Sequence, residues 1–427
     1  MLNKLKNIFK SDFAKNVLTL SVGTTLAQAI PVAISPILTR LYTPEDFGVL
    51  ALFMAIVAIL GSIVNAKYEM AILLPKEDKD AYALVKLSFL ISFGISVLTL
   101  IAVFIFKEKI AYSLEQPSVE NWLFLVPISI LLIGGYNSLN IFNNRVKNYR
   151  NIAKSSVSKS TSLAITQVGI GLLKVGTGGL ILGQLASYIG GNGVLIRGIR
   201  IHMPFIYNTQ FIKLKTVAKR YNKFPKFTLP AALLNSTNLN ITSFLISGIF
   251  SVQTLGFYSL ASRVLGGPSL VLGQSIGQVY FQKATSLRAN SHSIKPVFLK
   301  SLKKLLIVSI PFFGLLSFVV EPIFDIVFGP DWVSAGTISK VLIPLVFIRF
   351  IVSALSSTTT TLEKQEFDLL VNIFLLSGSI AVFALYRDLE AIKLITLYVK
   401  VLTGLYLGIL LVFYLLIIND DQKNKNI

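Results

Sequence analysis

The chain of 427 residues contains no cysteine and only two histidines, and few of its residues are charged. The absence of cysteine excludes disulfides and thiolate metal sites. His202 and His292 stand far apart in basic segments, so histidine metal chemistry is not expected either. Charged residues make up only 14% of the chain and hydrophobic residues 53%, with a mean hydropathy of +0.70. This composition is far from that of a soluble domain and predicts an integral membrane protein.

Motifs for enzymatic chemistry are also missing. No glycine-rich loop ends in Lys-Ser or Lys-Thr, which excludes ATP hydrolysis by the P-loop route. The acidic residues expected outside the membrane are scattered over short loops, and no pair of them suits general acid and base catalysis. The sequence therefore predicts that the protein is not an enzyme and that it needs no cofactor. Gly190 and Gly191 lie in an apolar run, where glycine favours close packing of helices.

The net charge of +20 is the one feature that would suggest nucleic acid binding in a soluble protein. The positive charges, however, lie in short connections between apolar runs. In a membrane protein this distribution is a signal of topology. No nucleic acid partner is expected.

Apolar runs of about 20 residues, the length that a helix needs to cross the hydrocarbon, predict twelve membrane spans. The fifth and sixth spans are divided at Lys174–Gly179, because one helix of the combined length would overshoot the bilayer and glycines permit a tight turn. The expected spans are 17–38, 47–65, 87–106, 122–142, 157–173, 179–199, 227–250, 255–281, 303–320, 337–360, 368–386 and 392–418.

The distribution of Lys and Arg predicts the orientation. Of the 40 cationic residues, 29 fall on the side of the two termini, 6 on the opposite side and 5 within the spans or at their edges. Because cytoplasmic loops carry an excess of Lys and Arg, both termini are expected in the cytoplasm. The longest basic connection, Arg197–Lys226, is expected to separate an N-lobe of six helices, 1–206, from a C-lobe of six helices, 207–427.

A repeated turn supports two related halves. Thr43–Leu52 and Ser251–Leu260 each begin with a hydroxyl residue that can cap a helix, and each then enters an apolar run through Phe47-Gly48 or Leu255-Gly256. The two segments lie about half the chain apart, as expected for pseudo-symmetric lobes. The predicted fold class is an all-α membrane protein of about twelve transmembrane helices in two such lobes.

Ionisable residues at membrane depth are the candidate site residues, because a charge at the centre of a membrane helix costs at least about 2.5 kcal/mol. Arg263 and Lys400 lie well inside expected spans. For both, a role in binding substrate competes with an internal ion pair or a side chain that reaches the interface. Lys86 and Lys340, near span ends, are expected to reach the interface.

Three further candidates lie in or beside the spans. Arg349 lies within the tenth expected span, Arg40 lies at the end of the first, and Glu69 follows the second. For Arg40, pairing with Glu45 or Asp46 across the turn is the competing interpretation. No acid lies in the middle of a span, so a cavity lined by these residues would suit an anionic substrate and disfavour a cation.

Several motifs in the chain resemble those of the polysaccharide transporter family, the O-antigen and capsule repeat-unit flippases of the multidrug/oligosaccharidyl-lipid/polysaccharide superfamily. The resemblance extends over almost the whole chain, in the same order. The matching segments are Leu38–Gly48, Tyr68–Pro75, Phe224–Phe227, Leu255–Arg263, Gly277–Ala284 and Phe328–Trp332.

The resemblance implies two six-helix lobes around a central cavity that opens alternately to either side of the bacterial cytoplasmic membrane. It implies a substrate that is an undecaprenyl-pyrophosphate-linked oligosaccharide. The residues fit this expectation, because pyrophosphate is an anion and suits the cations Arg263 and Arg40. The resemblance also implies contact with membrane lipid, coupling to a proton or sodium gradient, and polysaccharide polymerase and assembly proteins as partners.

Three other functions remain open at this point. A multidrug or small-molecule exporter of the same fold would usually need an acid in its cavity, and none is evident. A membrane enzyme such as a polymerase or ligase would carry a large outward loop. A structural scaffold would not need buried Arg and Lys.

Overall fold

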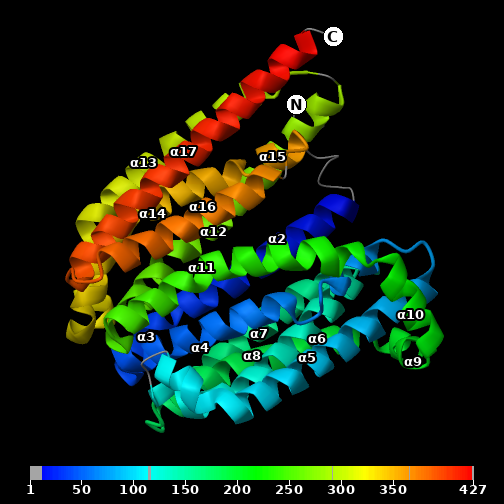
Figure 1. Cartoon of the computed structure of the whole chain (residues 1–427), viewed down its shortest axis with the longest axis horizontal. Helices are drawn as coiled ribbons and strands as arrows, with labels where there is room; N and C mark the ends of the chain where they lie inside the picture. The colour runs from blue at the N-terminus through cyan, green and yellow to red at the C-terminus, as the bar shows by residue number, and fades with distance from the viewer. Residues whose placement is uncertain (1–11, 114–116, 291, 365, 426–427) are drawn as a thin grey trace. The chain divides into compact units, whose positions relative to one another are not determined.

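Helices form the regular structure of the chain in a computed structural model that describes residues 12–113, 117–290, 292–364 and 366–425 (Figure 1). Within these ranges no β-strand is present. The helices pack into two units, Met1–Gly248 and Ile249–Ile427.

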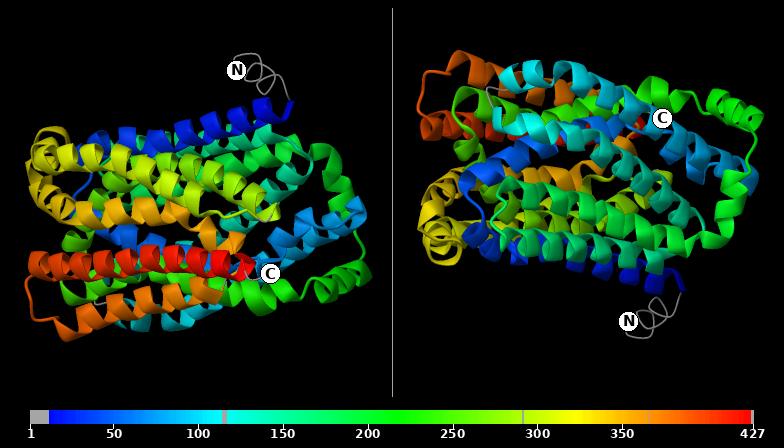
Figure 2. Two further views of the ribbon diagram at one scale, coloured as in Figure 1. Left: turned by 90° about the horizontal axis from the view of Figure 1, so that it is seen from above. Right: turned by 90° about the horizontal axis from the view of Figure 1, so that it is seen from below.

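In the first unit, α7 packs against α2 and α8, while α6 packs against α5, α8 and α4 (Figures 1 and 2). The longer helices are α2 (Asp12–Ala33), α3 (Ser35–Leu41), α4 (Pro44–Ile63), α5 (Asp78–Ser113), α6 (Leu125–Arg145), α7 (Tyr149–Gly171), α8 (Thr177–Gly198), α10 (Phe211–Arg220) and α11 (Leu229–Ile249). Short helical turns connect them: η1 (Tyr68–Leu73), η2 (Pro117–Phe124), η3 (Arg200–His202), α9 (Met203–Tyr207) and η4 (Phe224–Thr228).

In the second unit, α14 is the central helix, because α12, α13 and α17 all pack against it. The helices are α12 (Val252–Ala289), α13 (Lys295–Ile323), α14 (Val333–Leu355), α15 (Ser357–Thr361), α16 (Glu366–Leu385) and α17 (Ala391–Lys425). The turns η5 (Phe324–Phe328) and η6 (Pro330–Trp332) join α13 to α14.

The two capped turns predicted from the repeat are confirmed. The Thr43 hydroxyl accepts a hydrogen bond from the Asp46 amide at 3.2 Å, and the Asp46 carboxylate accepts one from the Thr43 amide at 3.0 Å, which completes a capping box at the start of α4. Ser251 caps α12 by a single such bond, because its hydroxyl accepts from the Thr254 amide at 3.1 Å. Each unit thus contains a long helix that begins at this turn.

The predicted division between the fifth and sixth spans is also confirmed. Helix α7 ends at Gly171 and α8 begins at Thr177. Lys174 and Gly176 between them have φ angles of 55° and 67°. The left-handed conformation reverses the chain here, and glycine adopts it without steric cost.

Among the described residues, nine helical segments are long and apolar enough to cross a membrane. They include α4, α8, α16 and α17, together with segments built on α2, α5, α6, α13 and α14. The remaining three expected spans correspond to α7, α11 and α12, so every expected span coincides with a helix. Because these three helices are not among the nine, the total of twelve membrane spans stays a prediction. The protein is a helical, multi-pass membrane protein.

The two units divide after Gly248, whereas the sequence placed the boundary between lobes at 206/207. The two divisions differ because the structure groups α11 with the first unit, whereas the sequence assigned this segment to the C-lobe. Within the first unit, the Ser236 hydroxyl of α11 donates a hydrogen bond to the Ala58 carbonyl of α4 at 3.1 Å. The boundary at 206/207 remains a prediction based on charge and on the repeat.

Candidate functional site

Lys159 is a cation in the middle of a helix, and two tyrosines flank it. Its Nζ lies 4.3 Å from the centroid of the Tyr136 ring of α6 and 4.0 Å from that of the Tyr188 ring of α8. The two rings meet edge to face, 5.9 Å apart. Such contacts stabilise an ammonium by about 0.5 to 2 kcal/mol. Within the described residues Lys159 forms no ion pair, so the rings compensate only part of the cost of taking its charge out of water.

Glycine and serine make room for this lysine. A Cβ atom added to Gly191 of α8 would lie 2.5 Å from Cγ of Lys159 and 3.0 Å from the Tyr136 ring. The Ser155 hydroxyl, one turn before Lys159, donates a hydrogen bond to the Gly191 carbonyl at 2.9 Å. Close packing at Gly191, predicted from the sequence, therefore creates the space that the Lys159 side chain occupies.

Arg349 of α14 is a second cation surrounded by tyrosines, in the other unit. It donates a hydrogen bond to the Tyr406 hydroxyl of α17, and its guanidinium carbon lies 5.8 Å from the centroid of the same ring. Tyr258 of α12 and Tyr398 of α17 are close enough to interact electrostatically with its charge. In the part of the chain that the structure describes, no carboxylate pairs with Arg349.

Arg263 lies on α12, in the same unit as Arg349 and on a helix that packs against α14. Its Nη1 atom is buried. The residue is eleven positions from the start of α12, about 16 Å along the helix axis. The structure therefore places two of the predicted cations on neighbouring helices in the interior of one unit.

Lys400 belongs to α17 of this unit, but its side chain is exposed. It shares one face of the helix with Leu407, Leu411 and Leu415, which are all more than half exposed. This position agrees with the alternative of a long side chain that reaches the interface. A role for Lys400 in binding remains a prediction.

Arg40 lies in the last turn of α3 and is exposed. Asp46, one of the acids suggested as its partner, is engaged elsewhere: besides the capping box, its Oδ1 accepts a hydrogen bond from the Thr177 hydroxyl at 2.6 Å. This carboxylate therefore ties the start of α4 to the start of α8. The second suggested partner, Glu45, lies in the first turn of α4, and its pairing with Arg40 stays a prediction.

Glu69 is a buried carboxyl residue in η1, which packs against α5 and α6 in the first unit. The residue is 5% exposed, and its Oε2 has no hydrogen-bond partner within the described residues. Lys67 Nζ lies 3.8 Å from its Oε1. Burial raises the pKa of Glu69 above its ordinary value, and Lys67 opposes this shift only in part.

We expect the variant Glu69→Gln to gain stability relative to the unmodified protein as pH rises. A raised pKa in the folded state means that the protonated carboxyl contributes stability at low pH, and that this contribution is lost as pH rises through the folded pKa. The glutamine side chain of the variant does not titrate. The melting temperature of the variant minus that of the unmodified protein should therefore increase as the pH is raised from about 4.5, the ordinary pKa of a glutamate, toward neutral pH. A decrease would show that the ion pair with Lys67 outweighs burial.

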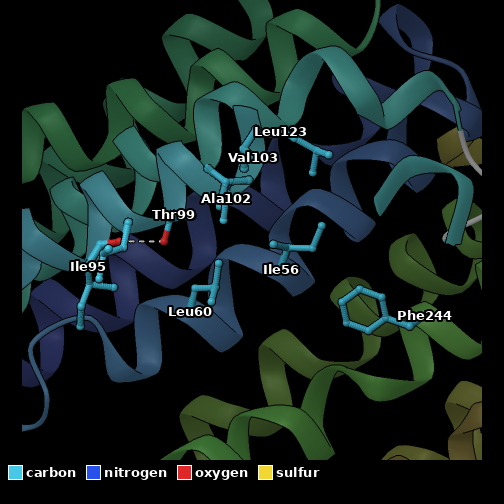
Figure 3. A pocket seen from close by; sticks show the side chains of 10 residues that line it. Ile56, Leu60, Ile95, Thr99, Ala102, Val103, Leu123 and Phe244 are labelled. Carbon is cyan, nitrogen blue, oxygen red and sulfur yellow. Dashed lines mark hydrogen bonds between the residues drawn. The ribbon is translucent and has the colours of Figure 1, made fainter. Parts of the chain in front are cut away.

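An apolar pocket of about 380 Å³ opens in the first unit (Figure 3). Its one side-chain hydroxyl, that of Thr99, donates a hydrogen bond to the Ile95 carbonyl at 2.8 Å. The pocket therefore offers a hydrocarbon surface with no free polar side chain. It is lined by Ile56, Leu60, Ile95, Leu98, Thr99, Ala102, Val103, Leu123, Val126 and Phe244.

Comparison with known families agrees with these features. Residues 37–337 match the profile of a family described as polysaccharide biosynthesis protein. The chain belongs to this family. The resemblance drawn from the sequence motifs is therefore confirmed at the level of this family.

Relatives of this polysaccharide biosynthesis protein include the succinoglycan biosynthesis transport protein ExoT of Rhizobium meliloti strain 1021, which is 22% identical over 309 residues. That match covers 72% of this chain but only 60% of ExoT. The lipopolysaccharide biosynthesis protein WzxC of Escherichia coli K12 is 18% identical over 83% of this chain and 71% of its own length. The structure of the lipid II flippase MurJ in an inward closed conformation shares the fold, with a TM-score of 0.74, 14% identity, and coverage of 95% of this chain and 90% of MurJ.

Lys159 was not among the site residues predicted from the sequence. The fifth span was expected at 157–173, which put Lys159 at its cytoplasmic edge and counted it among the cytoplasmic charges. Helix α7 begins at Tyr149, so Lys159 lies about 15 Å along the helix. The serines that surround Lys159 made this part of α7 too polar to be recognised by hydropathy. The spacing of Tyr136 and Tyr188 gave no signal, because these residues meet only through tertiary packing.

Proposed function

We propose that the protein translocates an undecaprenyl-pyrophosphate-linked oligosaccharide of the O-antigen or capsule type across the bacterial cytoplasmic membrane by alternating access. The observation that supports this most directly is that two cations are held among tyrosines inside helices, Lys159 in α7 and Arg349 in the candidate span built on α14. A charge at this depth is retained where a cavity hydrates it or an anion binds it. The pyrophosphate of the substrate supplies such an anion.

The tyrosines add to this recognition. Each presents an apolar ring and a hydroxyl, and both parts suit a sugar, which has apolar C–H faces and many hydroxyl groups. A site for cationic drugs would instead place carboxylates near the ligand. Among the residues that the structure describes, no carboxylate forms an ion pair with Lys159 or Arg349. The proposed substrate is therefore anionic at one end and rich in hydroxyls at the other.

The apolar pocket near Ala102 suits the lipid part of this substrate (Figure 3). A long isoprenoid chain gains from leaving water in proportion to its area, and it needs no polar partner. We propose that coupling to a proton or sodium gradient drives the transport, and that polymerase and assembly proteins receive the product. Arg263 and Arg40 are further candidates for contact with the pyrophosphate, and Glu69 for a step coupled to protonation.

Reconstitution tests the proposed function. Proteoliposomes would contain a fluorescent undecaprenyl-pyrophosphate oligosaccharide, and an impermeant quencher would report the fraction on the outer face. The protein should make the inner pool accessible within minutes, whereas empty liposomes should not. Transport of a cationic dye without movement of the lipid-linked oligosaccharide would overturn the proposal and favour the exporter of small molecules.

We predict that the connection from Arg197 to Lys226 lies in the cytoplasm, on the side with the larger positive charge. The chain has no cysteine, so single introduced thiols can be labelled selectively. In whole cells, Asn222→Cys should be protected from an impermeant maleimide, while Asp388→Cys should react; the Asp388 side chain is 98% exposed between α16 and α17. Reaction at position 222 together with protection at position 388 would show that the predicted orientation in the membrane is wrong.

A further inference from the structure

The connection between α8 and α11 combines strong positive charge with exposed apolar side chains. From Arg197 to Lys226 it contains eight Lys and Arg residues and no Asp or Glu. It folds into η3, α9, α10 and η4, of which α9 and α10 pack against α5 (Figures 1 and 2). Because α8 is a candidate membrane span that ends at Gly198, this folded segment begins where a span leaves the membrane.

The exposed apolar residues gather around the corner between α9 and α10. Phe205 is 60% exposed, Tyr207 81% and Phe211 74%. The other side of α10 is well packed, since Leu214 and Val217 are buried. Aromatic rings left on the surface beside a basic segment are typical of an element that lies in the interface of a membrane, where the rings enter the headgroup region.

A pocket of about 410 Å³ lies beside these rings, between the start of α5 and the loop that joins α9 to α10. Lys79 and Lys213 line it, together with Tyr82 and the polar segment Asn208–Gln210. Lys213 pairs with Asp80 at 2.9 Å, and Arg220 shares the same carboxylate at 3.4 Å. One acid thus meets two cations, and Lys79 has no ion pair within the described residues, so the pocket keeps a positive charge.

The rim of this pocket is held in place by side chains from α5. The Lys86 ammonium donates hydrogen bonds to the carbonyls of Tyr207 and Thr209, both at 2.7 Å. The expectation that Lys86 only reaches the interface is therefore incomplete, since it anchors the loop. The Tyr82 ring stacks on Phe205 with centroids 5.7 Å apart, and its hydroxyl lies 3.0 Å from Nδ1 of His202. The contacts of Lys86 and Tyr82 thus hold the loop that forms one side of this pocket.

We propose that this pocket binds the phosphate of an anionic phospholipid in the leaflet next to the basic connection. The Lys79 and Lys213 ammonium groups meet the phosphate, the Asn208–Gln210 segment meets the polar headgroup, and Phe205, Tyr207 and Phe211 lie among the lipids around it. The exposed rings identify a lipid as the source of the phosphate, because a free phosphate ion would leave them in water. The bound lipid fixes the connection on the membrane surface.

The test measures thermal unfolding of the purified full-length protein in a neutral detergent. Added phosphatidylglycerol should raise the melting temperature by about 3 °C or more, because a ligand that binds only the folded protein stabilises it. Phosphatidylcholine and inorganic phosphate should give little shift. The double variant Lys79→Gln/Tyr207→Ser should lose at least half of the phosphatidylglycerol shift. Lys300→Gln, which removes an exposed lysine from α13, should keep it.

Three results would each overturn the proposal. An equal phosphatidylglycerol shift in the double variant would show that lipid binds elsewhere. An equal loss in Lys300→Gln would show a response to net charge alone. A full shift with inorganic phosphate would show a site for the free ion. Since none of these measurements involves transport, the proposal can fail while the proposed function stands.

Discussion

Replacing Lys159 with methionine is expected to abolish export of the lipid-linked oligosaccharide while the protein remains folded. Methionine keeps an unbranched stem in the space beside Gly191 and near the two tyrosine rings, and removes only the charge. A charge-assisted hydrogen bond to an anion contributes about 1.5 to 3 kcal/mol, so transport should fall at least about tenfold. The measurement is the rate of translocation in proteoliposomes, together with surface polysaccharide in cells.

A structural role for Lys159 makes a different prediction. If the ammonium served only to join α6, α7 and α8 through the rings, Lys159→Met would lower the melting temperature and the amount of protein in the membrane. A functional role predicts an unchanged or higher melting temperature, because the cost of burying a charge disappears. Lys159→Arg should recover part of the transport by keeping the charge. Normal export by a stable Lys159→Met protein would remove this residue from the mechanism.

The matched control lies on the same helix. Lys154 is exposed near the start of α7, and the variant Lys154→Met makes the same chemical change there. Transport should stay within about twofold of the unmodified protein, because a surface charge contributes little. A similar loss in both variants would indicate that transport depends on the charge of α7 as a whole.

The sequence predicted the features that depend on local order. The caps at Thr43 and Ser251 follow from residues three apart, and the turn at Lys174–Gly179 follows from glycine and from the limit on helix length. Arg263 and Arg349 were found because an isolated cation in an apolar run is visible in the sequence alone. Each of these inferences needed only neighbouring residues.

The features that were missed depend on packing between helices. Lys159 stands among serines, and its environment comes from α6 and α8. The same limit explains Lys400: its span was recognised correctly, but only the packing of α17 shows that the side chain is exposed. Lys340, expected to reach the interface, pairs with Glu321 of α13 at 2.7 Å. The face of a membrane helix that meets a neighbour cannot be derived from hydropathy when nearly all faces are apolar.

Arg263→Ala is expected to abolish export, measured as the translocation rate in proteoliposomes and as surface polysaccharide in cells. The reason is that a charge deep within a membrane helix is retained where an anion binds it or a cavity hydrates it. The guanidinium lies about 16 Å along α12 with Nη1 buried, and its planar fork of donors suits a phosphate better than an ammonium does. Arg263→Lys should therefore recover part of the transport, since it keeps the charge without the bidentate geometry. Translocation rate and membrane abundance should be measured together for both variants.

Arg288 provides the control for this experiment, because it is an arginine near the other end of the same helix. It pairs with Asp420 of α17 at 2.7 Å, so Arg288→Ala tests the loss of an arginine that joins two helices. That variant should lower the melting temperature modestly and leave transport per molecule unchanged, because the pair is partly exposed. If Arg263→Ala behaved like Arg288→Ala, with less protein in the membrane but normal transport per molecule, Arg263 would be a structural residue. Lost transport at normal abundance would place its guanidinium in the path of the anionic substrate.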